Sequence, residues 1–156
     1  MDTKSLHKIS YGLYVIGATK AQKFNAQIAN TVIQVCSAPP TISVCLNKGN
    51  LTHEFVKDSQ AFTVSILTQD TPLDFIGKFG FKSGRETDKL RGINYRIGET
   101  GAPIVLDNAL AYLEARVISE ADAGTHTIFL AEVVAAKTLR EGEPLTYAYY
   151  QQVKRG

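Results

Sequence analysis

Four short polar segments carry the side chains that could bind a ligand or react. The first spans residues 24–31 and holds amide and hydroxyl side chains between small alanines: Asn25, Gln27, Asn30 and Thr31. Such a segment lets a flat ligand lie against backbone N–H groups while the amides bond its polar edge. A surface turn whose asparagines bond their own backbone explains the same residues, so both interpretations stay open.

The second segment, residues 46–53, places Lys48, two asparagines, a glycine and Thr52 between a strand end and a helix start. The first N–H groups of a helix have no partner inside the helix and favour anions. Together with the Lys48 ammonium and the Thr52 hydroxyl, they form a candidate cradle for a monophosphate. Ordinary helix capping beside one solvated lysine is the competing interpretation.

The third segment is a loop rich in cations and hydroxyls, residues 80–89, and the fourth is Gly124-Thr-His126 at the start of a long apolar run. The loop could hold a phosphate or a nucleotide ribose, although a solvated charged loop has the same composition. His126 could act beside a bound ligand, while a histidine next to a turn is more often a surface residue.

The motifs of several large enzyme classes are absent. No G-x-G-x-x-G follows a strand pattern, and neither G-x-x-x-x-G-K-[ST] nor G-x-S-x-G occurs. These absences exclude Rossmann dehydrogenases, P-loop enzymes and α/β-hydrolases. The histidines His7, His53 and His126 lie too far apart in the sequence to indicate a metal site, so none is predicted.

The length and net charge of the chain exclude further classes of protein. The 156 residues predict one domain over 1–156, large enough to bury a core without a metal or disulfide. Seventeen basic against fifteen acidic residues give a net charge of +2, too small to indicate a nucleic-acid binder. No stretch approaches the roughly 20 apolar residues that cross a bilayer, so no membrane association is expected.

Residues 11–18 resemble the apolar part of a signal peptide, but they are short, hold two glycines and lead into another patterned segment. We therefore interpret them as a strand. Cys36 and Cys45 lie in β-rich runs without a C-x-x-C motif. Buried free thiols in a reducing cytoplasm fit this pattern, with a disulfide between neighbouring strands as the alternative.

The elements that must position the polar segments are mostly strands. Short apolar runs separated by turn residues predict strands at residues 11–18, 28–36, 41–46, 61–67, 110–119, 125–137 and 145–150. A helix is predicted at 52–57, capped by Thr52. A second helix is predicted to begin with Thr71 as its cap and Pro72 at its first position, and Leu73, Ile76 and Phe79 or Gly80 supply its buried side chains. The resulting fold class is mainly β, an antiparallel barrel with a few short helices.

Alternation within residues 110–119 also predicts which side chains face the core. The expected inward side chains are Ala111, Leu113, Ala115 and Val117, and the expected outward ones are Tyr112, Glu114 and Arg116.

The order of the polar segments along the chain is more specific than any one of them. The stretches that matter are residues 25–26, 29–35, Pro39-Pro40, 44–48, 50–53, Phe79-Gly80, 83–85, 88–89 and 124–133. In this order the chain resembles the flavin reductase-like family, the FMN-binding split barrels, over nearly its whole length. Within that family it is most similar to flavoredoxin, the flavin domain of high-molecular-weight rubredoxin and related ferric reductases.

The resemblance implies an antiparallel Greek-key split β-barrel that forms a homodimer and binds one FMN per subunit. It implies that the isoalloxazine ring is lined by Asn25, Asn30, Thr31 and Val32. It implies that the ribityl chain and phosphate are held by Asn47, Lys48, Asn50, Thr52 and His53. It implies contacts to FMN or to the incoming nicotinamide nucleotide from Ser83, Gly84 and Lys89. His126 is placed where the nicotinamide would approach, although the chain has Gly-Thr-His where many relatives have Gly-Asp-His.

The activity that the resemblance implies is reduction of bound FMN by NADH or NADPH, with a flavin, ferric or protein acceptor. The alternative is a flavoredoxin-type electron carrier between protein partners such as rubredoxin or a flavodiiron protein. A split barrel that uses flavin only as a signal is a third interpretation. Residues 151–156 are similar to the segment that leads into a rubredoxin domain in fused relatives, so we expect them to act as a linker.

Overall fold

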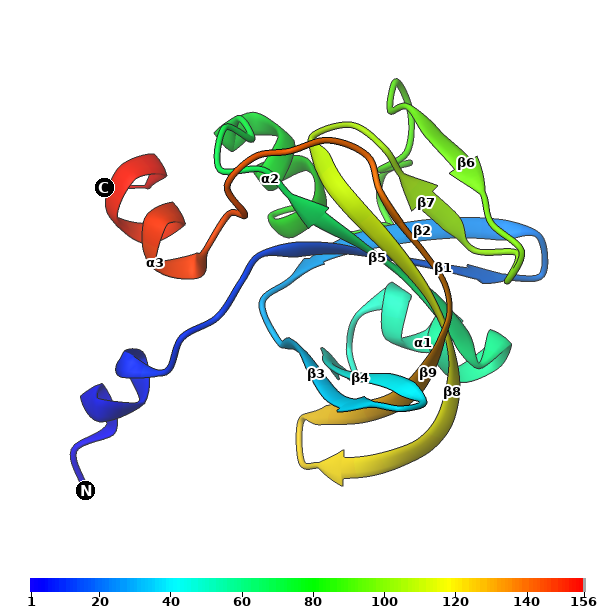
Figure 1. Ribbon diagram of the computed structural model, residues 1–156, viewed down its shortest axis with the longest axis horizontal. Coiled ribbons are helices and arrows are strands. Elements are labelled where there is room, and N and C mark those ends of the chain that lie inside the picture. The colour runs from blue at the N-terminus through cyan, green and yellow to red at the C-terminus, as the bar shows by residue number, and fades with distance from the viewer. Residues whose placement is uncertain (156) are drawn as a thin grey trace.

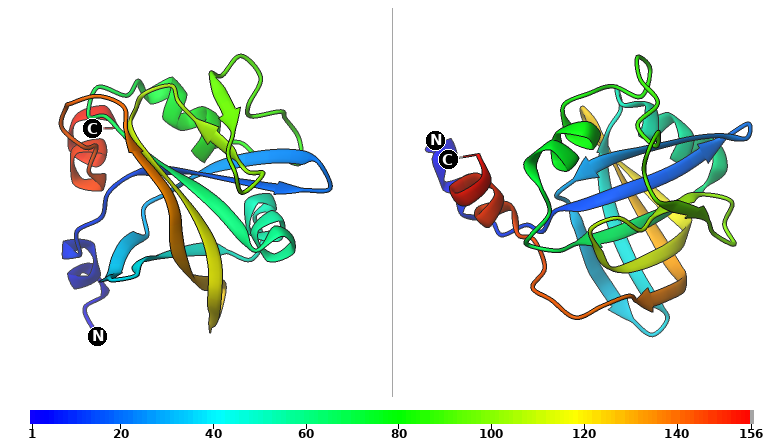
Figure 2. Two further views of the ribbon diagram at one scale, coloured as in Figure 1. Left: turned by 45° about the vertical axis from the view of Figure 1, so that its right-hand side comes forward. Right: turned by 90° about the horizontal axis from the view of Figure 1, so that it is seen from above.

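Most of the chain forms one antiparallel sheet of seven strands in the order β2-β1-β5-β8-β9-β4-β3 (Figure 1). The computed structural model describes residues 1–155. The sheet curves around a shared interior, as the view from above shows (Figure 2). Its strands are β1 (Tyr14–Lys20), β2 (Lys23–Ala29), β3 (Val32–Ser37), β4 (Pro40–Asn47), β5 (Ala61–Leu67), β8 (Ala109–Ala123) and β9 (His126–Thr138). This mainly β, antiparallel architecture confirms the predicted fold class.

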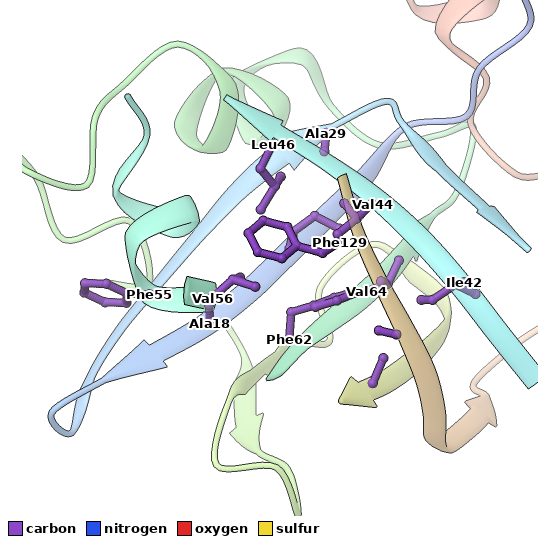
Figure 3. Packing of buried hydrophobic residues seen from close by; sticks show 13 residues of the cluster. Ala18, Ala29, Ile42, Val44, Leu46, Phe55, Val56, Phe62, Val64 and Phe129 are labelled. Atoms are coloured by element: carbon purple, nitrogen blue, oxygen red, sulfur yellow. The ribbon is translucent and has the colours of Figure 1, made fainter. Parts of the chain in front are cut away.

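Two clusters of buried side chains hold the sheet together from opposite faces. The first lies inside the barrel and includes Ile16, Val44 and Phe129 (Figure 3). The second lies on the outer side and includes Val15 and Ile76. Because successive side chains of a strand point to opposite faces, the neighbours Val15 and Ile16 enter different clusters, and β1 is buried on both sides.

The helices cover specific parts of the barrel. α1 (Leu51–Ser59) contributes Phe55 and Val56 to the inner cluster and ends at Gln60, whose left-handed φ of 57° terminates it. α2 (Leu73–Gly80) packs against β2 on the outer side. A short 3-10 helix, η1 (Thr3–Lys8), precedes the barrel, while α3 (Tyr147–Tyr149) and the π-helical turn η2 (Tyr150–Lys154) follow it.

A small two-stranded ribbon, β6 (Tyr95–Ile97) and β7 (Pro103–Val105), lies over the outer face of β5. The Thr63 hydroxyl donates to the Pro103 carbonyl oxygen at 2.6 Å, and the Ser65 hydroxyl donates to that of Val105 at 2.7 Å. These two buried hydroxyls fix the ribbon to the barrel.

Two of the predicted strands differ from the structure. Residues 28–36 belong to two strands, because the extended pairing is interrupted at Asn30 and Thr31. There the Thr31 hydroxyl donates to the Cys45 carbonyl oxygen. The strand predicted at 145–150 is wrong. Leu145 bonds the backbone of Leu67 and Leu13, and α3 begins two residues later. η2 takes up most of the predicted linker, whose residue 156 lies outside the described residues.

Both predicted helix caps are also wrong. Asn50 is the N-cap of α1, and Thr52 lies inside its first turn. Pro72 is the N-cap of α2 and no side chain caps this helix, while the Thr71 hydroxyl donates to the Thr68 carbonyl oxygen at 2.6 Å.

The predicted exposure of β8 and of the cysteines needs correction as well. Tyr112 and Glu114 are buried, since the ribbon and the Thr100 turn cover the face that the alternation assigned to solvent. Cys36 is exposed and Cys45 is half-buried, although both are free thiols as predicted. Cys36 is exposed because β3 lies at an end of the sheet.

Candidate functional site

A polar pocket of about 250 Å³ lies between β2, the start of α1, the end of α2 and the following loop. We call it the first pocket. Six of the predicted ligand-binding residues line it: Asn25, Asn50, Thr52, Ser83, Gly84 and Lys89. Residues that are up to 64 positions apart in the sequence therefore meet at one place, because β2 runs beside both the α1 start and the 82–84 loop.

Two hydrogen bonds donated by side-chain amides join β2 to the start of α1. Asn25 Nδ2 donates to Thr52 Oγ1 at 2.9 Å, and both side chains are buried. Asn50 Nδ2 donates to Gln27 Oε1 at 3.2 Å. Asn25 and Gln27 share one face of β2 because they are two residues apart. This spacing supports Gln27, which belongs to the first polar segment but is not among the FMN-binding residues that the resemblance implies.

The N-terminus of α1 opens into the first pocket. The Asn50 side chain does not cap the helix, and Gly49, Asn50, Leu51 and Thr52 all line the pocket. A helix start without a side-chain cap leaves backbone N–H groups to water or a ligand, and the helix dipole favours an anion there. Glu54, the acid of this first turn, is neutralised by Lys20 at 2.8 Å and Arg85 at 3.2 Å, and these bonds lower its pKa.

Lys89 adds a buried cation to the first pocket. Its residue is only 5% exposed, and its Nζ donates to the Phe79 carbonyl oxygen at the end of α2, at 2.9 Å. Burial lowers the pKa of the Lys89 ammonium to about 8. An ammonium has three donors, so Lys89 can bond a ligand while it keeps the bond to α2.

Gly84 brings the 82–84 loop into contact with Asn25. A β-carbon at this position would lie 2.1 Å from Asn25 Oδ1, so any side chain would displace either the loop or the amide. The close approach explains why a glycine is needed here.

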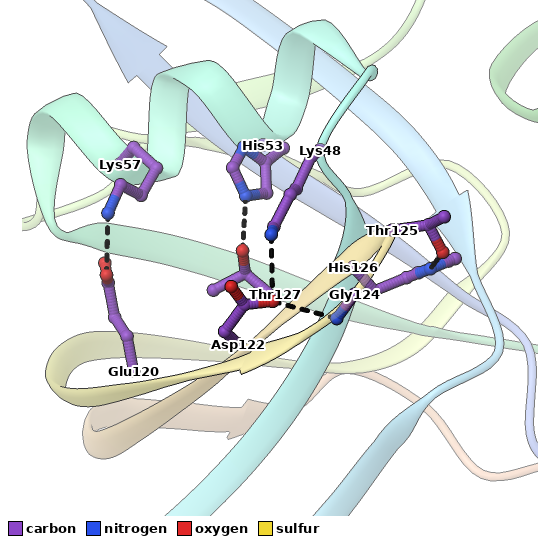
Figure 4. Close-up of polar contacts among 9 residues, drawn as sticks. All are labelled: Lys48, His53, Lys57, Glu120, Asp122, Gly124, Thr125, His126 and Thr127. Atoms are coloured by element: carbon purple, nitrogen blue, oxygen red, sulfur yellow. Dashed lines mark hydrogen bonds and ion pairs between the residues drawn. The ribbon is translucent and has the colours of Figure 1, made fainter.

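A second group of predicted residues lies at the tip of the β8–β9 hairpin (Figure 4). Asn47 of β4 pairs with His126, and the Lys48 ammonium bonds Asp122 at 2.9 Å. His53 Nε2 bonds the Thr127 hydroxyl at 2.8 Å, and burial lowers the pKa of His53. Asn47, Lys48, His53 and His126 are absent from the lining of the first pocket.

Three of the residues predicted to line the isoalloxazine ring, Asn30, Thr31 and Val32, lie outside the first pocket. Asn30 lines a neighbouring pocket of about 240 Å³ together with Tyr147, Tyr150 and Arg155. This pocket adjoins the first one, because Ile28, Gly80 and Phe81 line both. Thr31 bonds the β4 backbone, and Val32 lines an apolar pocket elsewhere on the barrel.

Two classes of site are not found in the part of the chain that the structure describes. Residues 1–155 contain no group of three or more His, Cys, Asp or Glu side chains that could hold a metal ion. None of the helices in that range is both long enough and apolar enough to cross a membrane.

The antiparallel barrel with its polar pocket at a helix N-terminus defines a split barrel of the flavin-binding class. The family model of the flavin reductase like domain matches residues 6–155, and the chain belongs to this family. The resemblance that the motif order indicates is thereby confirmed.

Two relatives match this chain over its whole length. It is 58% identical over 156 residues to the high molecular weight rubredoxin of Moorella thermoacetica, covering 68% of that protein. It is 49% identical to the ferric-chelate reductase (NAD(P)H) of Archaeoglobus fulgidus, covering 92% of that protein. Among solved structures, the FMN-binding protein of Thermus thermophilus matches with a TM-score of 0.77 and 26% identity, over 85% of this chain and 72% of that one.

Proposed function

We propose that the chain binds FMN with its phosphate in the first pocket and reduces it with NADH or NADPH. The observation that carries this proposal is the uncapped N-terminus of α1, which opens into the pocket that Lys89 also lines. The ferric-chelate reductase (NAD(P)H) relative supports the proposal, because its name states the same electron donors.

The residues of the first pocket fit a flavin monophosphate. The N–H groups of Leu51 and Thr52 would bond phosphate oxygens, and the Lys89 ammonium would offset their charge. The amides of Asn25 and Asn50 would bond hydroxyls of the ribityl chain. The ring would then extend toward Asn30, whose pocket adjoins the first one.

In this mechanism the cofactor supplies the redox chemistry, since a flavin accepts hydride from a nicotinamide. The side chains of the protein would bind and orient FMN and offset the charge of its phosphate. His126 remains our proposed contact for the nicotinamide. The Thr125 hydroxyl bonds its Nδ1 at 2.8 Å, so Nε2 is the nitrogen that would meet a ligand.

The second candidate function is electron transfer between protein partners without oxidation of NAD(P)H. It is favoured by the 58% identity to a protein named high molecular weight rubredoxin. In this case the bound FMN would exchange electrons with a rubredoxin or a flavodiiron protein. The first pocket and its residues would have the same role in both functions.

We also propose that the chain works as a homodimer in the cytoplasm. Strand β3 exposes an apolar surface that a second copy could cover. Both cysteines are free thiols, which supports a reducing compartment.

A visible absorption spectrum of the purified chain tests these proposals. We expect FMN to bind with one molecule per chain, and NADH or NADPH to bleach its absorption promptly under anaerobic conditions. No binding of added FMN would overturn the proposal. Bound FMN that neither nucleotide bleaches would instead support the electron carrier.

A matched pair of variants links the spectrum to the first pocket. Thr52→Val removes the acceptor of the Asn25 amide and should weaken FMN binding. Thr138→Val, at the exposed end of β9, should leave it unchanged.

A further inference from the structure

The loop that forms one wall of the first pocket contains a compact turn, which we call the 83–87 turn. The Ser83 carbonyl oxygen accepts from the N–H groups of Glu86 and Thr87 at 3.1 and 3.2 Å. The Ser83 hydroxyl accepts from the Arg85 N–H at 3.1 Å. Because these bonds lie within the turn, they keep it in one shape, and a displacement moves it as a unit.

The two ends of the loop are fixed, but the turn between them is exposed. At one end the Phe81 N–H bonds the Gly77 carbonyl oxygen at 2.8 Å, and at the other end Lys89 and Leu90 are buried. All residues from 82 to 88 are exposed except Gly84, which is partly buried. The 83–87 turn has no apolar side chain, so hydrophobic burial does not hold it over the pocket.

An ion pair connects the 83–87 turn to the barrel instead. Arg85 Nη2 lies 3.2 Å from Glu54 Oε2, and within residues 1–155 this is the one ion pair that the turn makes. Residues 49–52 at the start of α1 and residues 82–84 of the loop are separate parts of the lining of the first pocket. The pair therefore joins two walls of the pocket. Neither Glu54 nor Arg85 lines the pocket, so the pair lies outside the space that a ligand would occupy.

Strand β1 holds Glu54 in position for this contact. Glu54 Oε1 accepts from the Lys20 ammonium at 2.8 Å, while Oε2 accepts from Arg85, so each oxygen has its own partner. A carboxylate that is already held by one cation loses less conformational freedom when a second cation approaches. Glu54 is thus the fixed half of the pair, and Arg85 on the exposed turn is the half that moves.

The pair is strong enough to favour closure and weak enough to open. Its two side chains are 51% and 41% exposed, and ion pairs with this exposure change an equilibrium by a factor of roughly two to five. In the closed position Gly84 lies against the Asn25 amide, where a β-carbon would be 2.1 Å from Asn25 Oδ1. Closure therefore brings the loop onto a side chain that lines the first pocket.

We propose that Glu54 is a positioning residue, whose ion pair with Arg85 holds the 83–87 turn closed over the first pocket and limits how fast a ligand enters and leaves. The identity of that ligand, FMN, rests on the proposed function, whereas the closure does not. Because the pair lies outside the ligand's space, it closes the empty and the loaded pocket alike. Breaking it accelerates association and dissociation by the same factor, and the Kd stays unchanged.

Limited proteolysis of the ligand-free chain tests the closure by itself. Trypsin cleaves after Lys82, which is exposed and lies directly before the turn. When opening is fast, the rate of cleavage follows the population of the open form. We expect Glu54→Gln to be cut after Lys82 roughly two to five times faster than the wild type. Lys57→Gln breaks an ion pair between the same helix and Glu120 of β8, so it should be cut at the wild-type rate.

Stopped-flow fluorescence of FMN measures the effect on exchange. In Glu54→Gln we expect the association and dissociation rate constants to rise by the same factor as the cleavage rate. Arg85→Gln breaks the pair from the side of the turn and should give equal changes, and the double variant should add nothing to either single change. A Kd that rises at a constant association rate would make Glu54 a binding contact and overturn the proposal, as would unchanged rate constants.

Two results separate the failure of this proposal from that of the proposed function. A chain that fails to bind FMN, yet whose cleavage after Lys82 depends on Glu54, would overturn the proposed function and support the closure. A chain that binds FMN, but is cut at the same rate as wild type and as Glu54→Gln, would overturn the closure and leave the proposed function in place.

Discussion

Lys89 combines burial with a place in the wall of the first pocket. Desolvation disfavours its charged form, which is why its pKa falls to about 8. The hydrogen bond from Lys89 to the Phe79 carbonyl at the end of α2 compensates only part of the lost hydration, because this carbonyl is a neutral acceptor. An anionic ligand beside Lys89 would favour the charged form of this lysine, because its charge would replace the interaction with water that burial removes.

This cation predicts how FMN binding depends on pH. Below pH 8 the Lys89 ammonium is charged and would contribute to phosphate binding in the proposed site, and above pH 8 it loses its proton. We therefore expect the Kd for FMN to rise between about pH 7.5 and 9.5, and Lys89→Met to bind more weakly and without this dependence. Fluorescence titration of FMN at a series of pH values measures both. A wild-type Kd that is constant over this range would contradict the prediction.

The chain's own stability responds to Lys89 with the opposite sign. Between pH 8 and the ordinary lysine pKa of about 10.4, the unfolded chain binds a proton that the native chain does not. The cost of burying the charged group is thus fully present below pH 8 and is relieved as the pH rises. Ligand binding and stability are expected to change in opposite directions over this range.

At the level of elements, helix α1 is held against the β8–β9 hairpin by His53 and Lys57. His53 bonds Thr127, and Lys57 bonds Glu120 at 2.7 Å, which lowers the pKa of that carboxyl. The groups that face His53 are Lys57, Glu120 and Lys48, of which the lysines oppose its protonation and Glu120 favours it. Burial dominates and keeps His53 neutral.

The neutral state of His53 predicts a loss of stability in weak acid. Its native pKa lies below the ordinary value of about 6.5, so below that pH the unfolded chain binds a proton that the native chain lacks. The free energy of unfolding should therefore fall as the pH is lowered through 6.5. His53→Gln, which retains a donor for Thr127, should reduce that slope, whereas His7→Gln in the exposed η1 should not. Urea unfolding at pH 5 to 7.5 measures the slopes.

The β6–β7 ribbon depends on a buried carboxylate. Glu114 is 3% exposed, and its Oε1 accepts from the Thr100 hydroxyl at 2.9 Å and the Thr100 N–H at 3.2 Å. Gly98 lies so close that a β-carbon there would be 1.9 Å from the same oxygen. The turn between the two ribbon strands is therefore built around this carboxylate.

Replacing that carboxylate should destabilise the chain. Glu114→Ala leaves the Thr100 donors without their acceptor, and we expect a loss of about 1–3 kcal/mol in the free energy of unfolding. Glu132→Ala, on the exposed face of β9, is the matched control and should change it by less than about 0.5 kcal/mol. Equal losses in the two variants would show that the buried bonds contribute nothing.

The outward assignment of Glu114 illustrates which features a sequence can predict. Alternation placed β5 at residues 61–67 correctly, because Phe62 and Val64 lie on the face that enters the inner cluster, although the β6–β7 ribbon buries the opposite face as well. It failed for Tyr112 and Glu114 because a ribbon from a separate part of the chain covers their face. A periodic pattern reports local alternation and carries no information about a distant segment that packs on top.

The candidate site shows the same limit. Motif order selected six residues that line the first pocket, among them Lys89 and Gly84. It could not indicate that Lys48 bonds Asp122, since the two are 74 positions apart and meet only through the hairpin. Nor could it separate Asn25 from Val32, which are close in sequence and line different pockets.

At the scale of the whole molecule, strand β3 exposes an apolar surface at the end of the sheet. β3 lies at one end of the sheet order and pairs only with β4, and its Ile33 and Val35 are 61% and 47% exposed. Ile33 also lines an apolar pocket of about 400 Å³ with Tyr14 and Val64. An exposed apolar edge strand is a site for association with another chain.

This surface predicts that one charge abolishes the proposed homodimer. Ile33→Glu would place an unpaired carboxylate where a second copy should bury an isoleucine, so we expect it to sediment with half the mass of the wild type. Ile97→Glu makes the same change at an exposed isoleucine of the β6–β7 ribbon, which is not part of this surface, and should remain a dimer. Sedimentation equilibrium over a range of concentrations distinguishes the two. A wild-type chain that sediments as a monomer, or an Ile33→Glu variant that stays dimeric, would contradict the prediction. The exposed apolar side chains of β3 would then not be explained by dimerisation.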